Sequence, residues 1–135
     1  MRKLTVEAKA ENLDTVKQFV NHELEKVSCS YETLFQIDLV VEELFVNIAN
    51  YAYEKQIGTA TVLVEILDSP SRVEITFMDY GVPYDPLSLD DPDFDLPIAE
   101  KPIGGLGIFI VKQSMDHVSY EYNDGKNILL LKKNL

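Results

Sequence analysis

VVEELFVNIANYAYEK, residues 40–55, has apolar residues at the spacing of an α-helix. Glu43 and Asn47 stand four residues apart in it, so their side chains leave the predicted helix in the same direction on consecutive turns. They belong to a second stripe beside the apolar face, made of Gln36, Val40, Glu43, Asn47, Asn50 and Glu54. A solvated flank is the simplest interpretation of this stripe, and a binding flank is the alternative.

The bulk composition predicts one soluble domain over residues 1–135. The chain has 135 residues, of which 46% are hydrophobic, which is enough for a single core. Its formal net charge of -11 argues against direct binding to nucleic acid, because the phosphate backbone repels such a surface. Cys29 is the one cysteine, and there is no secretory signal or long apolar run. We therefore expect a cytoplasmic location and no membrane segment.

The N-terminal half predicts a strand followed by two helices. Residues 3–9 alternate apolar and polar side chains, as a half-buried strand does. Apolar residues between 13 and 27 then recur at helical spacing, with Asn12 or Asp14 as the candidate cap. Ser30 is the candidate N-cap of the second helix. The core stripe of that helix is expected to be Leu34, Ile37, Val41, Leu44, Phe45, Ile48 and Ala52.

The C-terminal half predicts two β-hairpins. TATVLVEIL (59–67) and RVEITFMD (72–79) alternate with period two around the turn DSPS, and VSYEY and NILLLKK flank NDG. A short helix is expected to begin near Leu106. The order of elements predicts an α+β fold, a two-layer α/β sandwich with a mixed, mainly antiparallel sheet and helices packed on one face.

Residues 80–103 form an unusually long connection. It holds five of the six prolines and six acidic residues against one base, Lys101. Connections of this length inside a compact domain are usually binding loops, lids or solvated inserts.

Two glycine-containing stretches flank this connection. In DYGVPYDP (79–86), Asp79 continues the inward parity of Val73, Ile75 and Phe77, so the strand ends by pointing a carboxylate toward the core. Gly81 then allows the close approach of a backbone or a flat ligand. In KPIGGLGIFIVKQSMD (101–116), glycines precede a helix start, where free N–H groups favour phosphate. A turn and a hinge are the simpler interpretations of these two stretches.

In their order and spacing, these stretches resemble the GHKL ATPase superfamily with its Bergerat fold, also described as the histidine kinase-like ATPase domain. Within this superfamily, the length of the chain and the sequence of its second predicted helix are similar to those of the anti-sigma factor serine/threonine kinases. Residues 43–47 resemble the N box of that superfamily. Residues 79–83, which end at Pro83, resemble its first glycine box. The second glycine box is matched by residues 104–107, which are Gly104, Gly105, Leu106 and Gly107.

The resemblance implies a role for each matching position. Asp79 would accept a hydrogen bond from the adenine amine of ATP, and Gly81 would give the base room. Asn47 would coordinate Mg²⁺, and Glu43 would be the general base. Residues 86–103 would form a lid, and the backbone of Gly105 to Gly107 would contact the phosphates.

The chain departs from the family at several positions. Tyr51 stands where many relatives carry a histidine, and Asn127 stands where a threonine often contacts phosphate. Lys101 is the base expected to reach the terminal phosphate, with Lys112 as a weaker substitute. The acidic connection would repel a polyphosphate unless its carboxylates fold outward.

The resemblance leaves three functions to separate. The first is a transferase that phosphorylates a serine on a STAS-domain anti-sigma factor antagonist and controls a sigma factor, and hence transcription, by partner switching. The second is a non-catalytic nucleotide-binding module that switches partners. The third, a fragment of a histidine kinase, is disfavoured because only His22 and His117 are present and no dimerisation hairpin precedes the fold. Dimers are common in the family, so a homodimer is one expected assembly.

Overall fold

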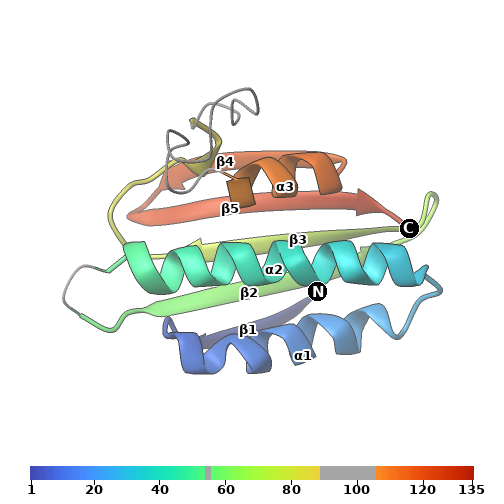
Figure 1. Cartoon of the computed structure of the whole chain (residues 1–135), viewed down its shortest axis with the longest axis horizontal. Coiled ribbons are helices and arrows are strands. Elements are labelled where there is room, and N and C mark those ends of the chain that lie inside the picture. Colours follow the sequence, from blue (N-terminus) through green and yellow to red (C-terminus); the bar gives the residue numbers. More distant parts are fainter. Residues whose placement is uncertain (54–55, 89–105) are drawn as a thin grey trace, which may run out of the picture.

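The computed structural model describes residues 1–53, 56–88 and 106–135. Over these residues a five-stranded sheet is covered by three α-helices (Figure 1). The strands are β1 (Arg2–Glu7), β2 (Thr59–Leu67), β3 (Arg72–Asp79), β4 (His117–Asn123) and β5 (Lys126–Asn134). The helices are α1 (Leu13–Leu24), α2 (Tyr31–Tyr51) and α3 (Leu106–Ser114), with short 3-10 turns at Ala10–Asn12 and Pro86–Ser88.

The sheet has the strand order β1-β2-β3-β5-β4. All four pairings between these strands are antiparallel, so the parallel component of the expected mixed sheet is absent from the described residues. The chain places β5 beside β3 and leaves β4 at the edge, which sets Asp79 opposite Asn127 in the register. This pairing brings together two polar residues from distant parts of the sequence.

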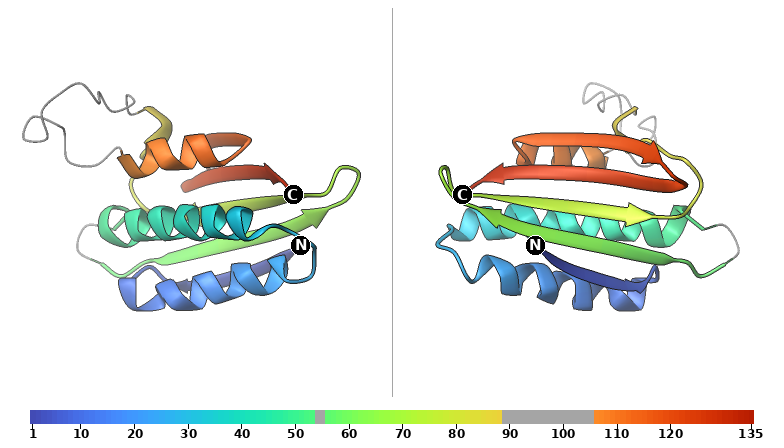
Figure 2. Two further views of the ribbon diagram at one scale, coloured as in Figure 1. Left: turned by 45° about the vertical axis from the view of Figure 1, so that its right-hand side comes forward. Right: turned by 180° about the vertical axis from the view of Figure 1, so that it is seen from behind.

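The three helices lie on the same face of the sheet, and no helix of the described residues covers the opposite face, as the view from behind shows (Figure 2). The two-layer α+β prediction is therefore confirmed. Helix α2 crosses the middle and buries Ile37, Val41, Leu44 and Phe45. The sheet meets it with its own buried side chains: Val62, Val64, Val73, Ile75 and Phe77. Removing this apolar surface from water drives the packing of the two layers.

The helix ends agree with the sequence in part. Ser30 caps α2 as expected, because its hydroxyl accepts a hydrogen bond from the Thr33 N–H at 3.1 Å. The expected cap of α1 is wrong in its chemistry: Asn12 stands at the N-cap position but makes no cap hydrogen bond there. Its side-chain amide donates instead to the Glu7 carbonyl at 2.9 Å. Helix α1 also ends at Leu24, three residues before the last apolar position of the predicted stripe.

The turn between β4 and β5 follows the NDG prediction. Asp124 and Gly125 both have positive φ, 53° and 77°, which is typical of the primed turns that join antiparallel strands. In the described part of the chain, no helix is long and apolar enough to cross a membrane.

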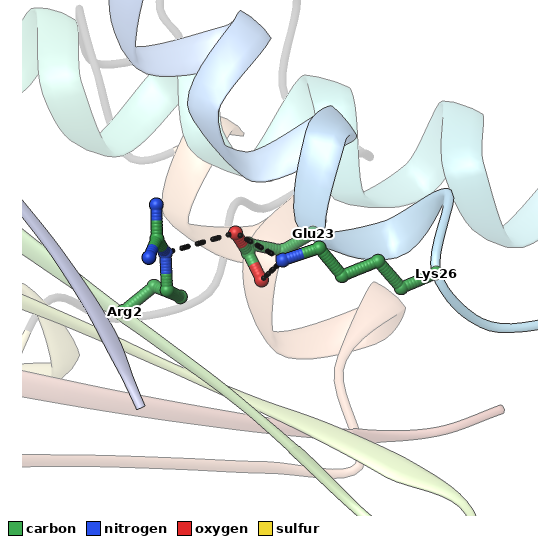
Figure 3. Close-up of polar contacts among 3 residues, drawn as sticks. All are labelled: Arg2, Glu23 and Lys26. Carbon is green, nitrogen blue, oxygen red and sulfur yellow. Dashed lines mark hydrogen bonds and ion pairs between the residues drawn. The ribbon is translucent and has the colours of Figure 1, made fainter.

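A buried carboxylate joins the edge strand to the first helix (Figure 3). Glu23 of α1 is only 5% exposed, and its Oε1 lies 3.4 Å from Nε of Arg2 in β1. The Lys26 ammonium donates to both Glu23 carboxylate oxygens, at 3.1 and 2.9 Å. This hydrogen bond from Lys26 is the main reason why the pKa of Glu23 lies below its ordinary value, against the opposing effect of burial.

The Glu23 contacts predict a pH-dependent loss of stability in the Glu23→Gln variant. Both cations are more than half exposed, so solvent screens the pairs, and we expect a loss of about 0.5–1 kcal/mol in the free energy of unfolding at neutral pH. A lowered folded-state pKa contributes stability above the unfolded-state value and loses it as pH falls through the folded-state value. Urea unfolding should therefore show the difference at pH 7 and its disappearance in acid.

The control for this measurement is Glu25→Gln, at an exposed position just beyond the end of α1. It removes the same charge and should change the free energy of unfolding by less than about 0.5 kcal/mol. Equal effects of the two variants would show that net charge, rather than the contacts of Glu23, produces the change.

Candidate functional site

A cavity opens between the C-terminal half of α2, the end of β3 and the β4–β5 hairpin. It holds about 540 Å³ of space not filled by atoms, part of which is open to solvent. Apolar side chains predominate in its lining, with a few amide, carboxyl and phenol groups between them. The lining residues are Leu44, Asn47, Ile48, Tyr51, Ala52, Phe77, Asp79, Val82, Tyr84, Pro86, Tyr120, Asn127 and Leu129. An apolar hollow with a small number of placed polar groups is the usual form of a small-molecule site.

Asp79 is the buried carboxylate of this cavity. As the last residue of β3 it keeps the inward parity of the strand, and it is 6% exposed. Its Oδ1 accepts hydrogen bonds from the Gly81 N–H and from the side-chain amide of Asn127, both at 2.9 Å. Its Oδ2 takes no hydrogen bond from the residues that the structure describes. In that part of the chain, every fully buried side-chain oxygen or nitrogen has a hydrogen-bond partner. Because Oδ2 has none, it is not fully buried. Asp79 lines the cavity, so Oδ2 is open to it.

Gly81 allows the loop after β3 to touch the end of α2. A Cβ at this position would lie 2.3 Å from the Ala52 carbonyl oxygen and 2.6 Å from the Ala52 Cβ. The next residue, Val82, donates its N–H to the same carbonyl at 3.1 Å. The close approach that the sequence predicted at Gly81 is therefore made by Ala52 of the chain itself. Pro83, also in this loop, is exposed.

Asn127 lies beside Asp79 at the bottom of the cavity. Its amide nitrogen donates to Asp79 and to the Val82 carbonyl at 2.9 Å each, and it lies 3.4 Å from the Gly81 carbonyl. Its amide oxygen accepts from the Tyr84 N–H and from the Tyr120 hydroxyl. Asn127 thus joins β5, β4 and the loop after β3.

Asn47 and Tyr51 bring the polar flank of α2 to the cavity. Both line it one helical turn apart, as the sequence spacing predicts. The Asn47 amide is half-buried and has no hydrogen bond to the residues described here, so it is free to meet a ligand. Tyr51 is 66% exposed and stands at the mouth. Val40, the one apolar residue of the same predicted stripe, is fully buried.

Glu43 lies one turn before Asn47, against the first turn of α3. A Cβ on Gly107 would fall 1.9 Å from both Cδ and Oε1 of Glu43. The Glu43 side chain therefore occupies the space that any other residue at position 107 would fill. Leu106 begins α3 at the same place. Lys101, Gly104 and Gly105, which the sequence placed in the site, fall outside the described residues.

Sequence reasoning missed most of the cavity wall. Tyr84 and Pro86 follow the first glycine stretch, and Tyr120 comes from the edge strand β4. Burial raises the pKa of the Tyr120 phenol, so the hydroxyl keeps its proton at neutral pH. The hydroxyl donates a hydrogen bond to the Asn127 amide oxygen. Period-two parity along residues 118–122 was the available signal for the inward direction of Tyr120.

Tyr53 supports the site from behind. Its hydroxyl donates to the Thr59 carbonyl at 2.6 Å and accepts from the Tyr80 N–H at 2.8 Å. Burial is the main cause that raises the pKa of this phenol as well. These bonds fix the residue that follows Asp79 and thereby the end of β3.

The residues present fit a nucleotide with a divalent cation. Over the described ranges, no group of three or more His, Cys, Asp or Glu side chains could hold a metal ion alone. Mg²⁺ suits this arrangement, because it commonly takes one or two protein oxygens together with phosphate and water. Asn47 offers one such oxygen, and the open Oδ2 of Asp79 offers an acceptor to an amine.

Comparisons with known proteins identify the family of the chain. Residues 6–133 match the family described as histidine kinase-like ATPase domain. The serine-protein kinase RsbW of Bacillus cereus (strain G9842) is 24% identical over 133 residues, which cover 96% of this chain and 82% of that protein. The RsbW kinase of Halalkalibacterium halodurans is 28% identical, with coverages of 96% and 80%.

A solved structure shows the same fold. The crystal structure of the RsbU and RsbW domains of a Mycobacterium tuberculosis protein covers 100% of this chain with a TM-score of 0.64. This chain spans 33% of that longer chain, and the two are 11% identical, so the likeness is one of fold alone. The match along residues 6–133 settles the classification: the chain belongs to the histidine kinase-like ATPase domain family.

Proposed function

We propose that the chain binds ATP with Mg²⁺ and transfers the terminal phosphoryl group to a serine of a protein partner. The observation that carries the proposal is the open Oδ2 of Asp79 in an apolar cavity that Asn47 also lines. The similarity to RsbW serine-protein kinases supports a serine as the acceptor. The partner proposed from the resemblance is a STAS-domain anti-sigma factor antagonist, and a sigma factor is a second partner, so that transcription is controlled by partner switching in the cytoplasm.

Each residue then has a separate task. Asp79 accepts a hydrogen bond from the adenine amine, and the apolar side chains of the cavity pack against the faces of the base. Asn47 would supply an oxygen to Mg²⁺, and the bound ion would neutralise charge on the phosphates. The N–H groups at the start of α3, beginning at Leu106 and Gly107, face the phosphates.

Glu43 is the proposed general base. It accepts the proton of the serine hydroxyl while the serine oxygen bonds to the terminal phosphorus, and the bond from that phosphorus to the bridging oxygen of the leaving ADP breaks. Its position supports this role, because Glu43 lies one turn before Asn47 on α2 and against Gly107 in the first turn of α3.

A non-catalytic nucleotide-binding module is the second candidate. It is favoured by the contact of Glu43 with Gly107, because Glu43 is absent from the lining of the cavity as described. In this alternative the nucleotide sets the shape of a partner-binding surface, and no phosphoserine is formed.

Asp79→Asn should weaken ATP binding by about 10-fold to 100-fold, the cost of losing a hydrogen bond to a charged group. The Gly81 N–H and the Asn127 amide both donate to one side of Asp79, so the variant must turn its own oxygen toward them. Its NH₂ group then faces the adenine amine, donor against donor. Isothermal titration calorimetry with ATP, with and without Mg²⁺, measures the change.

Asp85→Asn is the matched control for this titration. Asp85 lies in the same loop but not in the cavity lining, and its Oδ1 accepts from the Leu87 N–H at 2.8 Å, which an asparagine oxygen can also do. We expect ATP affinity within about 2-fold of wild type in this control. Equal affinities of wild type, Asp79→Asn and Asp85→Asn would place the nucleotide elsewhere.

Glu43→Gln should reduce phosphoryl transfer by about 100-fold or more, because the amide cannot take the serine proton. ATP affinity should stay within about 3-fold of wild type, since Glu43 does not line the cavity. The assay follows labelled phosphate from ATP to serine on purified STAS-domain proteins from the same organism. Glu42→Gln is the control. It makes the same change at the neighbouring position, where the carboxylate pairs with Lys17 at 3.2 Å.

Two outcomes of this assay would contradict the catalytic assignment. Loss of ATP binding in Glu43→Gln would make Glu43 a structural part of the site. Stable complexes of wild type with STAS-domain proteins, formed with ATP and without phosphoserine, would favour the non-catalytic module.

A further inference from the structure

We propose that Asn127 is a positioning residue: it fixes the direction in which Asp79 accepts hydrogen bonds and thereby makes the cavity selective for a purine with an amine at position 6. The inference rests on the proposed function, since it concerns how the same site recognises its nucleotide. It replaces the phosphate contact expected for Asn127 by a contact within the protein.

The orientation of the Asn127 amide is fixed by groups that can play only one role. The Tyr84 backbone N–H can only donate, and it lies 3.1 Å from the amide oxygen. The Val82 carbonyl can only accept, and it lies 2.9 Å from the amide nitrogen. A flipped amide would set donor against donor and acceptor against acceptor, so only one orientation satisfies both neighbours.

The fixed orientation of the Asn127 amide determines which oxygen of Asp79 accepts its hydrogen bond. The amide nitrogen of Asn127 must donate, and Oδ1 of Asp79 lies 2.9 Å away and accepts. The Gly81 N–H donates to the same oxygen at 2.9 Å. Because Oδ1 already accepts from two donors, Oδ2 is the carboxylate oxygen left to accept a hydrogen bond from a ligand in the cavity.

An open carboxylate oxygen discriminates between purines by their substituent at position 6. An amine donates to it, whereas a carbonyl at the same position presents an acceptor to an acceptor. Sites that place a buried polar group in this way reject the mismatched ligand strongly, because the group is left without a partner.

The amide hydrogens of Asn127 are not available for a phosphate. One is directed to Asp79, and the other to the Val82 carbonyl, with the Gly81 carbonyl near by at 3.4 Å. Asn127 is also 7% exposed, at the bottom of the cavity beside the proposed position of the base. Its contribution to binding therefore acts through Asp79.

The test compares ATP with inosine triphosphate, which carries a carbonyl at position 6, on wild type and Asn127→Asp. In the variant the amide nitrogen becomes an oxygen that faces Oδ1 of Asp79, and the contacts from Tyr84 and Tyr120 can remain. Two facing carboxylates share one proton and hold it to a higher pH than either would alone. The protonated pair keeps the hydrogen bond between position 127 and Oδ1 of Asp79 and loses the one to the Val82 carbonyl, whereas the fully ionised pair loses both.

The expected signature is a pH profile of nucleotide affinity. Asn127→Asp should bind ATP within about 3-fold of wild type at about pH 5.5 and about 10-fold or more weakly at about pH 8, where the shared proton is lost. Its preference for ATP over inosine triphosphate should fall in parallel. Titration of the nucleotide phosphates affects wild type and variant equally and cancels in the ratio.

Other groups near the pair do not produce this profile. Burial raises the pKa of Tyr53 and Tyr120 above the ordinary value of about 10, so neither loses its proton in this range. The remaining neighbours are unchanged between the two proteins, and their effects cancel in the same ratio. The titratable and charged groups around the pair are Tyr51, Tyr53, Tyr84, Asp85, Tyr120 and Lys126.

Asn123→Asp is the matched control. It makes the same change of charge at an exposed position in the same hairpin, opposite Lys126 in the register. It should keep the affinity and the purine preference of wild type, and the ratio of its ATP affinity to that of wild type should not change with pH. Circular dichroism at each pH establishes that all proteins compared are folded.

The outcomes separate the two levels of the proposal. A wild type that binds neither nucleotide overturns the proposed function. A wild type that prefers ATP while Asn127→Asp shows the same affinity, preference and pH ratio overturns the positioning role of Asn127 alone. If Asn127→Asp does not fold, Asn127→Ser replaces it, because its short hydroxyl cannot span Asp79, Val82 and Tyr84 together. Unchanged ATP affinity and preference in Asn127→Ser would overturn the inference in the same way.

Discussion

Close contact between α2 and two glycines is the constraint on which the arrangement of the site depends. Gly81 brings the end of β3 onto Ala52, and Gly107 brings the start of α3 onto Glu43. A side chain at position 81 would collide with the Ala52 backbone, and one at position 107 would displace the Glu43 carboxylate from its place. One helix therefore serves as the core of the fold and as the wall against which both flanking segments are placed.

The sequence predicted the parts of the site that depend on local periodicity. Helical spacing placed Glu43, Asn47 and Tyr51 on one flank, and strand parity placed Asp79 inward. The same reasoning failed for the cap of α1, where Asn12 found a partner in the Glu7 carbonyl rather than in its own helix. Local pattern predicts the face of an element and is weaker at choosing among competing hydrogen-bond partners.

The polar network around Asn127 could not be predicted in the same way. It depends on the pairing of Asp79 with Asn127 across β3 and β5, and these residues are 48 positions apart. Nothing in the spacing of the chain specifies that β5, rather than β4, lies beside β3. The assignment of Asn127 to phosphate followed from family position, whereas its neighbours follow from the strand order.

In the proposed function, the charge distribution of the described residues favours phosphate binding through the helix dipole and a metal over binding through basic side chains. The cavity lining, as far as the chain is described, contains no lysine or arginine. Lys17 lies between Asp38 and Glu42, and Lys132 pairs with Glu74, both away from the cavity. A phosphate near α3 would thus meet N–H groups and the positive end of the helix dipole first.

The proposed function assigns selectivity for a base and attraction for phosphates to different parts of the fold. The first rests on the buried pair of Asp79 and Asn127, where low polarity makes each unmatched hydrogen bond costly. The second would rest on backbone groups and a divalent cation, which respond to charge and not to the identity of the base. In the proposed function the two contributions are physically distinct, so a change in the pair would alter which purine binds, and a change at Glu43 would alter what happens to its phosphate.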